Sequence, residues 1–175
     1  MIRIAHGIFF ALAAGLAAAP LLAQDAPPAC SSPLPLPELL AGWGASRISL
    51  VASAKASQTR KAVLPLGVAA DADLLPTPSV QYPVQPGKPG GSVSFGGIFA
   101  FEAPAAGTYR VAINAHSWTD IIEGKAALVS SAHGRGPACT GITKMVDYPL
   151  QAGRHLLQIA ANGDPKLTIL VVRLP

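Results

Sequence analysis

Charged side chains are scarce in this sequence. Asp, Glu, Lys and Arg make up 13% of its 175 residues, and the formal net charge is +4. The basic residues lie one at a time along the chain, and Arg60 and Lys61 form the one adjacent pair. Proteins that bind nucleic acids usually concentrate basic residues on one face, interleaved with aromatic side chains, and aromatic residues make up only 6% here. Nucleic acid is therefore excluded from the expected partners.

The sequence motifs of common catalytic sites are absent as well. The glycine-rich stretch over 90–96 lacks the second glycine that a G-x-S-x-G nucleophile elbow requires. GRGPAC at 134–139 has a cysteine where the last glycine of a dinucleotide-binding fingerprint belongs. The nine acidic residues are dispersed, whereas acid–base catalysis by carboxylates needs two of them brought together. These patterns predict no catalytic residue.

Long hydrophobic runs are confined to the first residues of the chain. Arg3 precedes an apolar run over Ile8–Ala18, and small residues follow up to Ala23. This pattern is typical of a signal peptide cleaved after residue 23, and the run is shorter than the roughly 20 apolar residues that span a bilayer. We expect a periplasmic or secreted protein with no transmembrane segment in the mature chain.

Cysteine occurs only twice, as Cys30 and Cys139. In an exported chain an even cysteine count favours a disulfide, which here would join the mature N-terminus to the segment HGRGPACTGITK at 133–144. Closing so long a loop is worth about 4–5 kcal/mol in the chain-entropy model. A reactive pair of Cys139 with His133 is the competing interpretation.

Proline and glycine, each present 17 times, divide the chain into short segments. Residues 24–45 are predicted to form a proline-rich extended arm that ends in a helical turn stopped by Gly42 and Gly44. Turn signals separate most of the strands that alternation predicts beyond this arm: 46–53, 61–68, 79–86, 90–104, 107–116, 125–132, 141–150, 153–162 and 166–175. Many short strands with little helix favour an all-β fold, an antiparallel β-sandwich of the jelly-roll type with a single domain over 46–175.

Alternation within these strands predicts which side chains enter the core. Tyr109, Val111 and Ile113 share one face of their strand. Over 90–104 the residues expected on one face are Val93, Phe95, Phe99 and Phe101, with Gly97 as a gap or bulge. AAGTYRVAI at 105–113 and QAGRHLLQI at 151–159 align residue for residue, so that Tyr109 corresponds to His155. We therefore expect two similar strand entries, with His155 as a packed side chain.

Polar candidates for a site gather in two loops. The predicted binding residues are His116, Trp118, His133, Arg135 and Lys144, which combine an aromatic ring with groups that hold anions. Trp43 and Tyr82 are further candidate exposed aromatics, while the competing interpretation of Trp118 is a side chain that caps the core beneath a loop. An alternative metal site would use two histidines and a carboxylate, as non-haem iron requires: His116, Asp120 and His133.

The strands over 88–175 resemble the jelly-roll domains of the bacterial pre-peptidase C-terminal type. GIFAFEAP leads through AGTYRV into the next strand, and a later L-x-A-G-x-(Y/H)-x-L-x-I pattern closes the sandwich. Such domains accompany secreted hydrolases as processing, secretion or polymer-binding modules. The resemblance implies a β-sandwich without an active site of its own.

The whole mature chain also resembles a group of small exported alphaproteobacterial proteins through the strings KPGGSVSFGG, HGRGPACTGITKMVDYPL and LQIAANGD. Some of that group carry the label homogentisate dioxygenase, which implies an iron cofactor, although this sequence has no H-x-H followed by a carboxylate. The leading hypothesis is a non-catalytic binding or envelope accessory module without a cofactor, whose partner is an envelope polysaccharide or protein. The alternatives are an Fe-dependent dioxygenase and a purely structural envelope protein.

Overall fold

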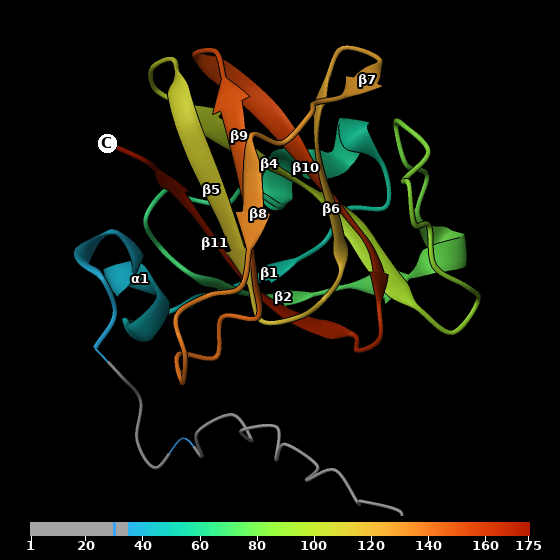
Figure 1. Ribbon diagram of the computed structural model, residues 1–175. Helices are drawn as coiled ribbons and strands as arrows, with labels where there is room; N and C mark the ends of the chain where they lie inside the picture. Colours follow the sequence, from blue (N-terminus) through green and yellow to red (C-terminus); the bar gives the residue numbers. More distant parts are fainter. Residues whose placement is uncertain (1–29, 31–34) are drawn as a thin grey trace, which may run out of the picture.

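The computed structural model describes Cys30 and residues 35–175, which form two β-sheets packed face to face (Figure 1). The predicted signal peptide, 1–23, and most of the arm before residue 35 lie outside the described residues. Sheet A has the strand order β1 (Ile48–Val51), β2 (Ala70–Asp73), β11 (Lys166–Arg173), β5 (Gly107–Ile113), β9 (Lys144–Leu150), β8 (Ala132–Gly134). Sheet B has the order β3 (Leu75–Pro76), β4 (Phe95–Ala103), β10 (Gly153–Asn162), β6 (Trp118–Glu123), β7 (Ala126–Ala127). The predicted single-domain β-sandwich is confirmed.

One strand pair departs from the expected antiparallel arrangement. β1 and β2 are parallel, with Ile48 beside Ala70, whereas the other strand pairs in the described part of the chain are antiparallel. A parallel pair needs a long crossover, and the connection over 52–69, which contains the 3₁₀ helix η2 (Ala56–Lys61), is long enough to return the chain to the same end. Sheet A is therefore mixed.

The core lies between the sheets and is built by alternate residues. Tyr109, Val111 and Ile113 of β5 are buried against side chains of sheet B, such as Phe99 and Leu157. Each large apolar side chain buried in this way contributes about 1.5–3 kcal/mol. The predicted faces of β5 and of most of β4 are confirmed, but Val93 precedes β4 and is 86% exposed, so its placement beside the phenylalanines is wrong.

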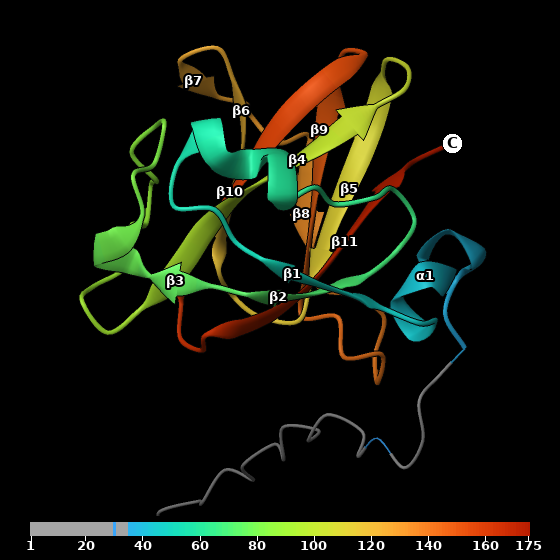
Figure 2. The same cartoon turned by 180° about the vertical axis from the view of Figure 1, so that it is seen from behind.

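A second apolar cluster covers the outer face of sheet A. The 3₁₀ helix η1 (Glu38–Leu40) and helix α1 (Ala41–Gly44) bring Leu40 and Trp43 onto Leu170 and Val172, and α1 lies beside β11 in both views (Figures 1 and 2). Trp43 is only 3% exposed, so the expectation of an exposed ring is wrong. The helical turn predicted at the end of the arm packs this ring inward because β11 presents apolar residues on both faces.

Two predicted strands, 61–68 and 79–86, are wrong, and the predicted strand 125–132 forms only β7 and the first residue of β8. The segment 61–68 makes only isolated bridges, from Val63 to Ala100 and from Leu66 to Val171, and 79–86 makes one from Gln81 to Lys55. Proline has no N–H to donate to a strand ladder, and Pro65 interrupts the first segment. The second segment contains two prolines, at 83 and 86, and follows the 3₁₀ helix η3 (Thr77–Ser79).

The internal repeat of the sequence has a structural counterpart. The Tyr109 hydroxyl donates a hydrogen bond to the Ala105 carbonyl over 2.7 Å, and His155 Nε2 bonds to the Gln151 carbonyl over 2.8 Å. Both bonds tie a strand entry to the backbone four residues earlier. His155 is 5% exposed and packs on Phe101 with 5.7 Å between ring centroids, which confirms that it is a packed side chain.

In the described part of the chain, no helix combines the length and the apolar character that crossing a membrane requires.

Replacing Trp43 by Ala should lower the free energy of unfolding by about 3–5 kcal/mol, because it empties the centre of the outer cluster. Urea unfolding followed by circular dichroism measures this change. Val93→Ala is the matched control, and a change at this exposed site should stay within about 0.5 kcal/mol. A loss below about 1 kcal/mol for Trp43→Ala would show that the cluster is not part of the folded core.

Candidate functional site

One depression is lined by residues of β6 and β8, at the edge where the two sheets meet. It has a volume of about 450 Å³, and we call it the lateral pocket. Its walls come from β6, from β8 and β9, and from the segment between β7 and β8. The lining residues are Trp118, Thr119, Asp120, Leu128, Val129, Ser130, His133, Lys144, Val146 and Tyr148.

The lateral pocket exists because the two sheets end differently at this edge. In sheet B, β7 pairs only with Ile122 and Glu123 of β6, so the first part of β6 has one unpaired edge. In sheet A, β8 continues the sheet beyond β9 and pairs His133 with Val146. Paired residues project from the same face of a sheet, and Val146 is in the inter-sheet core. His133 therefore lies on the face of sheet A that looks toward sheet B.

Trp118 forms an aromatic wall of the pocket and is partly buried. Its Nε1 donates a hydrogen bond to Asp120 Oδ2 over 2.8 Å. The backbone at Gly87 passes so close that a Cβ there would lie 2.7 Å from the indole ring. The ring is thus held on one side by a loop, as the capping interpretation expects, and it also lines the pocket.

Asp120 belongs to a buried polar network. Its Oδ2 also accepts a hydrogen bond from Gln158 Nε2 over 2.9 Å, and the same Nε2 donates to the Val84 carbonyl over 3.0 Å. Asp120 is 8% exposed, and Gln158 is fully buried with its Oε1 unpartnered. The network fixes the carboxylate, which in turn orients the indole of Trp118.

Thr119 and Tyr148 place two hydroxyl groups at the inner wall of the pocket. The Tyr148 hydroxyl donates to the Thr119 carbonyl over 2.7 Å, and burial raises the pKa of Tyr148 to about 12. Thr119 is 6% exposed, and its Oγ1 has no hydrogen-bond partner. Leaving a buried hydroxyl unpaired costs about 1–3 kcal/mol, so Thr119 Oγ1 is an unsatisfied polar group at the inner wall of the pocket.

Lys144 supplies the positive charge of the lateral pocket. Its Nζ donates to the Ser117 carbonyl over 2.8 Å and lies 5.8 Å from the centroid of the Trp118 ring. Lys88 Nζ lies 6.0 Å from the same centroid. Burial lowers the pKa of Lys144, Asp120 acts in the opposite direction, and Lys88 lowers it further. The ammonium is thus fixed in place and partly removed from water.

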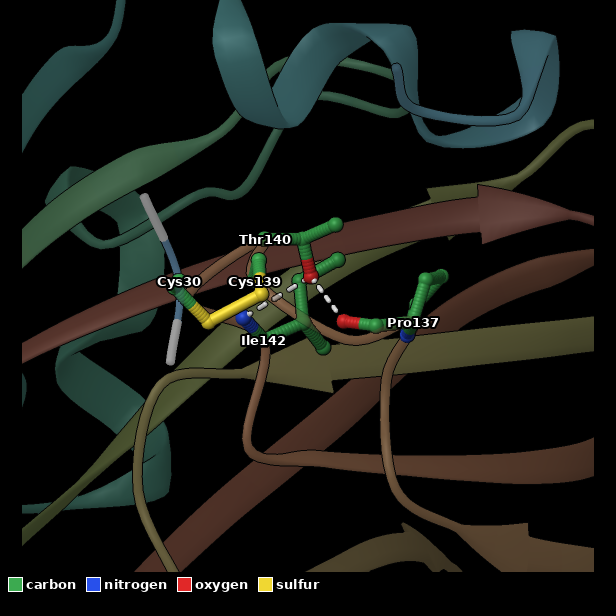
Figure 3. Close-up of a disulfide and its surroundings, with 5 residues drawn as sticks. All are labelled: Cys30, Pro137, Cys139, Thr140 and Ile142. Carbon is green, nitrogen blue, oxygen red and sulfur yellow. Dashed lines mark hydrogen bonds between the residues drawn. A yellow bond between two sulfur atoms is a disulfide. The ribbon is translucent and has the colours of Figure 1, made fainter. Parts of the chain in front are cut away.

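A second depression of about 390 Å³ surrounds the disulfide between Cys30 and Cys139. We call it the disulfide-loop pocket, and Figure 3 shows the bridge with its neighbours. Thr140 Oγ1 donates to the Pro137 carbonyl over 2.7 Å and accepts from the Ile142 amide over 3.3 Å. The lining residues are Cys30, His116, Arg135, Gly136, Pro137, Ala138, Cys139, Gly141, Ile142 and Thr143.

The disulfide predicted from the cysteine count is confirmed. It spans 109 residues with 5.3 Å between the two Cα atoms. Trp43 Nε1 donates to the Thr140 carbonyl over 2.9 Å, so the loop is also hydrogen-bonded to helix α1. With Cys139 in the bridge, its pairing with His133 as a free nucleophile is wrong.

The structure divides the five predicted binding residues between the two depressions. Trp118, His133 and Lys144 line the lateral pocket, and His116 and Arg135 line the disulfide-loop pocket. Tyr82, the other candidate aromatic, is partly buried and donates its hydroxyl to the Ile159 carbonyl over 3.0 Å.

The alternative iron ligands, His116, Asp120 and His133, do not line a common pocket. His116 and His133 line different depressions, and Asp120 is bonded to Trp118 and Gln158. Over Cys30 and residues 35–175, no three His, Cys, Asp or Glu side chains are grouped so that they could hold a metal ion.

Three residues of the site were not predicted from the sequence: Thr119, Tyr148 and Gln158. Thr119 and Tyr148 occupy core positions of strands, where alternation predicts packing only. Gln158 carried a usable signal, because a glutamine within the apolar run LLQIAA requires a buried hydrogen-bond partner.

Replacing both cysteines by serine should lower the free energy of unfolding by about 4 kcal/mol, since the bridge closes a 109-residue separation. Urea unfolding of the wild type and the double variant, each with and without reductant, measures the loss. Reductant should destabilise the wild type and leave the double variant unchanged. Equal stability of the oxidised wild type and the double variant would contradict the expectation.

Comparison with known proteins finds no protein-family model that matches this chain, and no curated protein matches it significantly.

Proposed function

We propose that the protein is an exported, non-catalytic binding module of the cell envelope that holds a polysaccharide in the lateral pocket. The predicted signal peptide over 1–23 supports export. The Cys30–Cys139 disulfide supports it independently, because disulfides form and persist in oxidising compartments.

The observation that carries the proposal is the buried, unpartnered Thr119 Oγ1 beside the aromatic wall of Trp118. Sugar rings combine apolar C–H faces with many hydroxyl groups. The apolar face packs on an aromatic side chain, and a hydroxyl can donate to Thr119 Oγ1 or accept from it. Binding would therefore repay the cost of the unpaired group.

The size of the pocket favours a polysaccharide over a folded protein. Pockets for small ligands have volumes of about 300–1,000 Å³, and the lateral pocket falls in this range at about 450 Å³. A stable protein–protein interface instead buries roughly 800 Å² on each partner. A few sugar units fit the depression, and the rest of a polymer continues into solvent.

The ionisable groups in the pocket support binding without hydrolysis. Glycoside hydrolysis normally uses two carboxyl groups about 5–10 Å apart, and Asp120 is the only carboxylate that lines the lateral pocket among the described residues. Its Oδ2 accepts hydrogen bonds from Trp118 and Gln158. With its pKa near 12, Tyr148 stays protonated at neutral pH and keeps its hydrogen bond to the Thr119 carbonyl.

Titration with polysaccharides tests the proposal through tryptophan fluorescence. The chain has two tryptophans, and Trp43 is 3% exposed while Trp118 lines the pocket. Polygalacturonate, alginate, galactan and dextran are the probes. At least one should change the emission of the wild type saturably and leave that of Trp118→Phe unchanged. If none binds, by fluorescence or by calorimetry, the proposal is overturned.

Thr119→Val separates binding from folding. The substitution removes the unpartnered Oγ1 and keeps the side-chain shape, so the free energy of unfolding should stay equal or rise. Affinity for the bound polysaccharide should fall about three- to tenfold, the equivalent of one hydrogen bond. Thr108→Val in β5, which lines neither pocket, is the control. If Thr119→Val binds the polysaccharide with unchanged affinity, the Thr119 hydroxyl does not contact the ligand.

A further inference from the structure

The two depressions are neighbours because the same three segments of chain build both. Each segment contributes at least one residue to each pocket. These pairs, with the residue of the disulfide-loop pocket first, are His116 and Trp118, Arg135 and His133, and Thr143 and Lys144. A polymer that leaves one pocket along these segments enters the other.

The charges that line the two pockets are mostly of one sign. Lys144 lies in the lateral pocket, and Arg135 lies in the disulfide-loop pocket, which also contains His116 and which no carboxylate of the described residues lines. Within Cys30 and residues 35–175, neither Arg135 nor His116 has a hydrogen-bond or ion-pair partner, whereas other arginines of the chain, such as Arg47 and Arg110, do. Arg135 therefore remains available for an anionic group, which a guanidinium binds through two parallel hydrogen bonds.

Asp120 is the one carboxylate among the described residues that line the two pockets, and it restricts the kind of anion that can bind. It lies in the lateral pocket beside Lys144 and accepts hydrogen bonds. A ligand with a high density of negative charge, such as a polyphosphate backbone, would be repelled there. A sugar hydroxyl would donate to it, and a carboxylate on the same sugar would face Lys144. The lining thus matches a ligand that carries both hydroxyl groups and carboxylates.

We propose that the lateral pocket and the disulfide-loop pocket are successive subsites for one acidic polysaccharide, whose uronate carboxylates are held by Lys144 and Arg135. This inference rests on the proposed function, since it assigns the same site a substrate class and a second subsite. Trp118 and Thr119 bind a sugar ring in the first subsite. Arg135, with His116 beside it, binds the carboxylate of a following unit in the second.

Binding of polygalacturonate and of neutral galactan to the full mature chain, measured by calorimetry at low and high salt, tests the inference. Polygalacturonate should bind at least tenfold more tightly than galactan at low salt, and this preference should shrink as salt screens the charges. Equal affinity for the two polymers would overturn the acidic preference and leave the proposed function standing.

The second subsite is tested by Arg135→Met. Arg135 is exposed and has no partner in the described structure, so the variant should fold normally. Affinity for polygalacturonate should fall on the order of tenfold, as expected for the loss of a charge-assisted contact, and affinity for galactan should not change. Arg60→Met, an exposed arginine that lines neither pocket, is the matched control.

The remaining outcomes separate the two proposals. If Thr119→Val weakens polysaccharide binding and Arg135→Met does not, the lateral pocket binds alone and the second subsite is wrong. If polyglutamate or single-stranded DNA binds as tightly as polygalacturonate and with the same dependence on Arg135, the ligand is an anion of another class and the polysaccharide assignment is wrong. If no polymer binds, both proposals fail.

Discussion

The two sheets pack face to face, and this packing sets where the core lies and where a pocket can open. Side chains such as Phe101 of β4 and Tyr109 of β5 fill the space between the sheets. The chain passes from sheet B to sheet A and back over β4, β5 and β6, so strands that follow one another in sequence lie in different sheets. At β6 and β8 the sheets no longer cover each other fully. The lateral pocket forms at that edge.

A second layer of packing connects the N-terminal arm to the site. Leu40 and Trp43 cover the outer face of sheet A, and the Trp43 indole is hydrogen-bonded to the loop that carries Cys139. The disulfide joins the same loop to Cys30. Because Cys30 also lines the disulfide-loop pocket, the arm both stabilises the fold and forms part of the candidate binding surface.

The buried polar groups near the lateral pocket lower the stability of the fold where they lack hydrogen-bond partners. Gln158 and Asp120 are buried in a network that leaves Gln158 Oε1 unpartnered, and Thr119 Oγ1 is unpartnered as well. An apolar core would be more stable at these positions. Departures from the rules of packing concentrate at binding sites, and here they lie along the wall of the lateral pocket that carries an aromatic ring and a partly buried lysine.

The β-sandwich, the core faces of β5 and most of β4, the packed His155 and the disulfide could all be predicted from the sequence. Strand alternation is a local pattern, and two cysteines in an exported chain can form only one intramolecular bridge. It placed five candidate residues in two loops and could not divide them between pockets. The tertiary structure decided that Trp43 is buried and Trp118 lines a cleft, although both lie beside turns. It also placed Thr119 and Tyr148, which occupy core positions in their strands, at the wall of the lateral pocket. The physical reason is that a pocket depends on which strands end at the same edge of two sheets, and pairing between distant segments sets that edge.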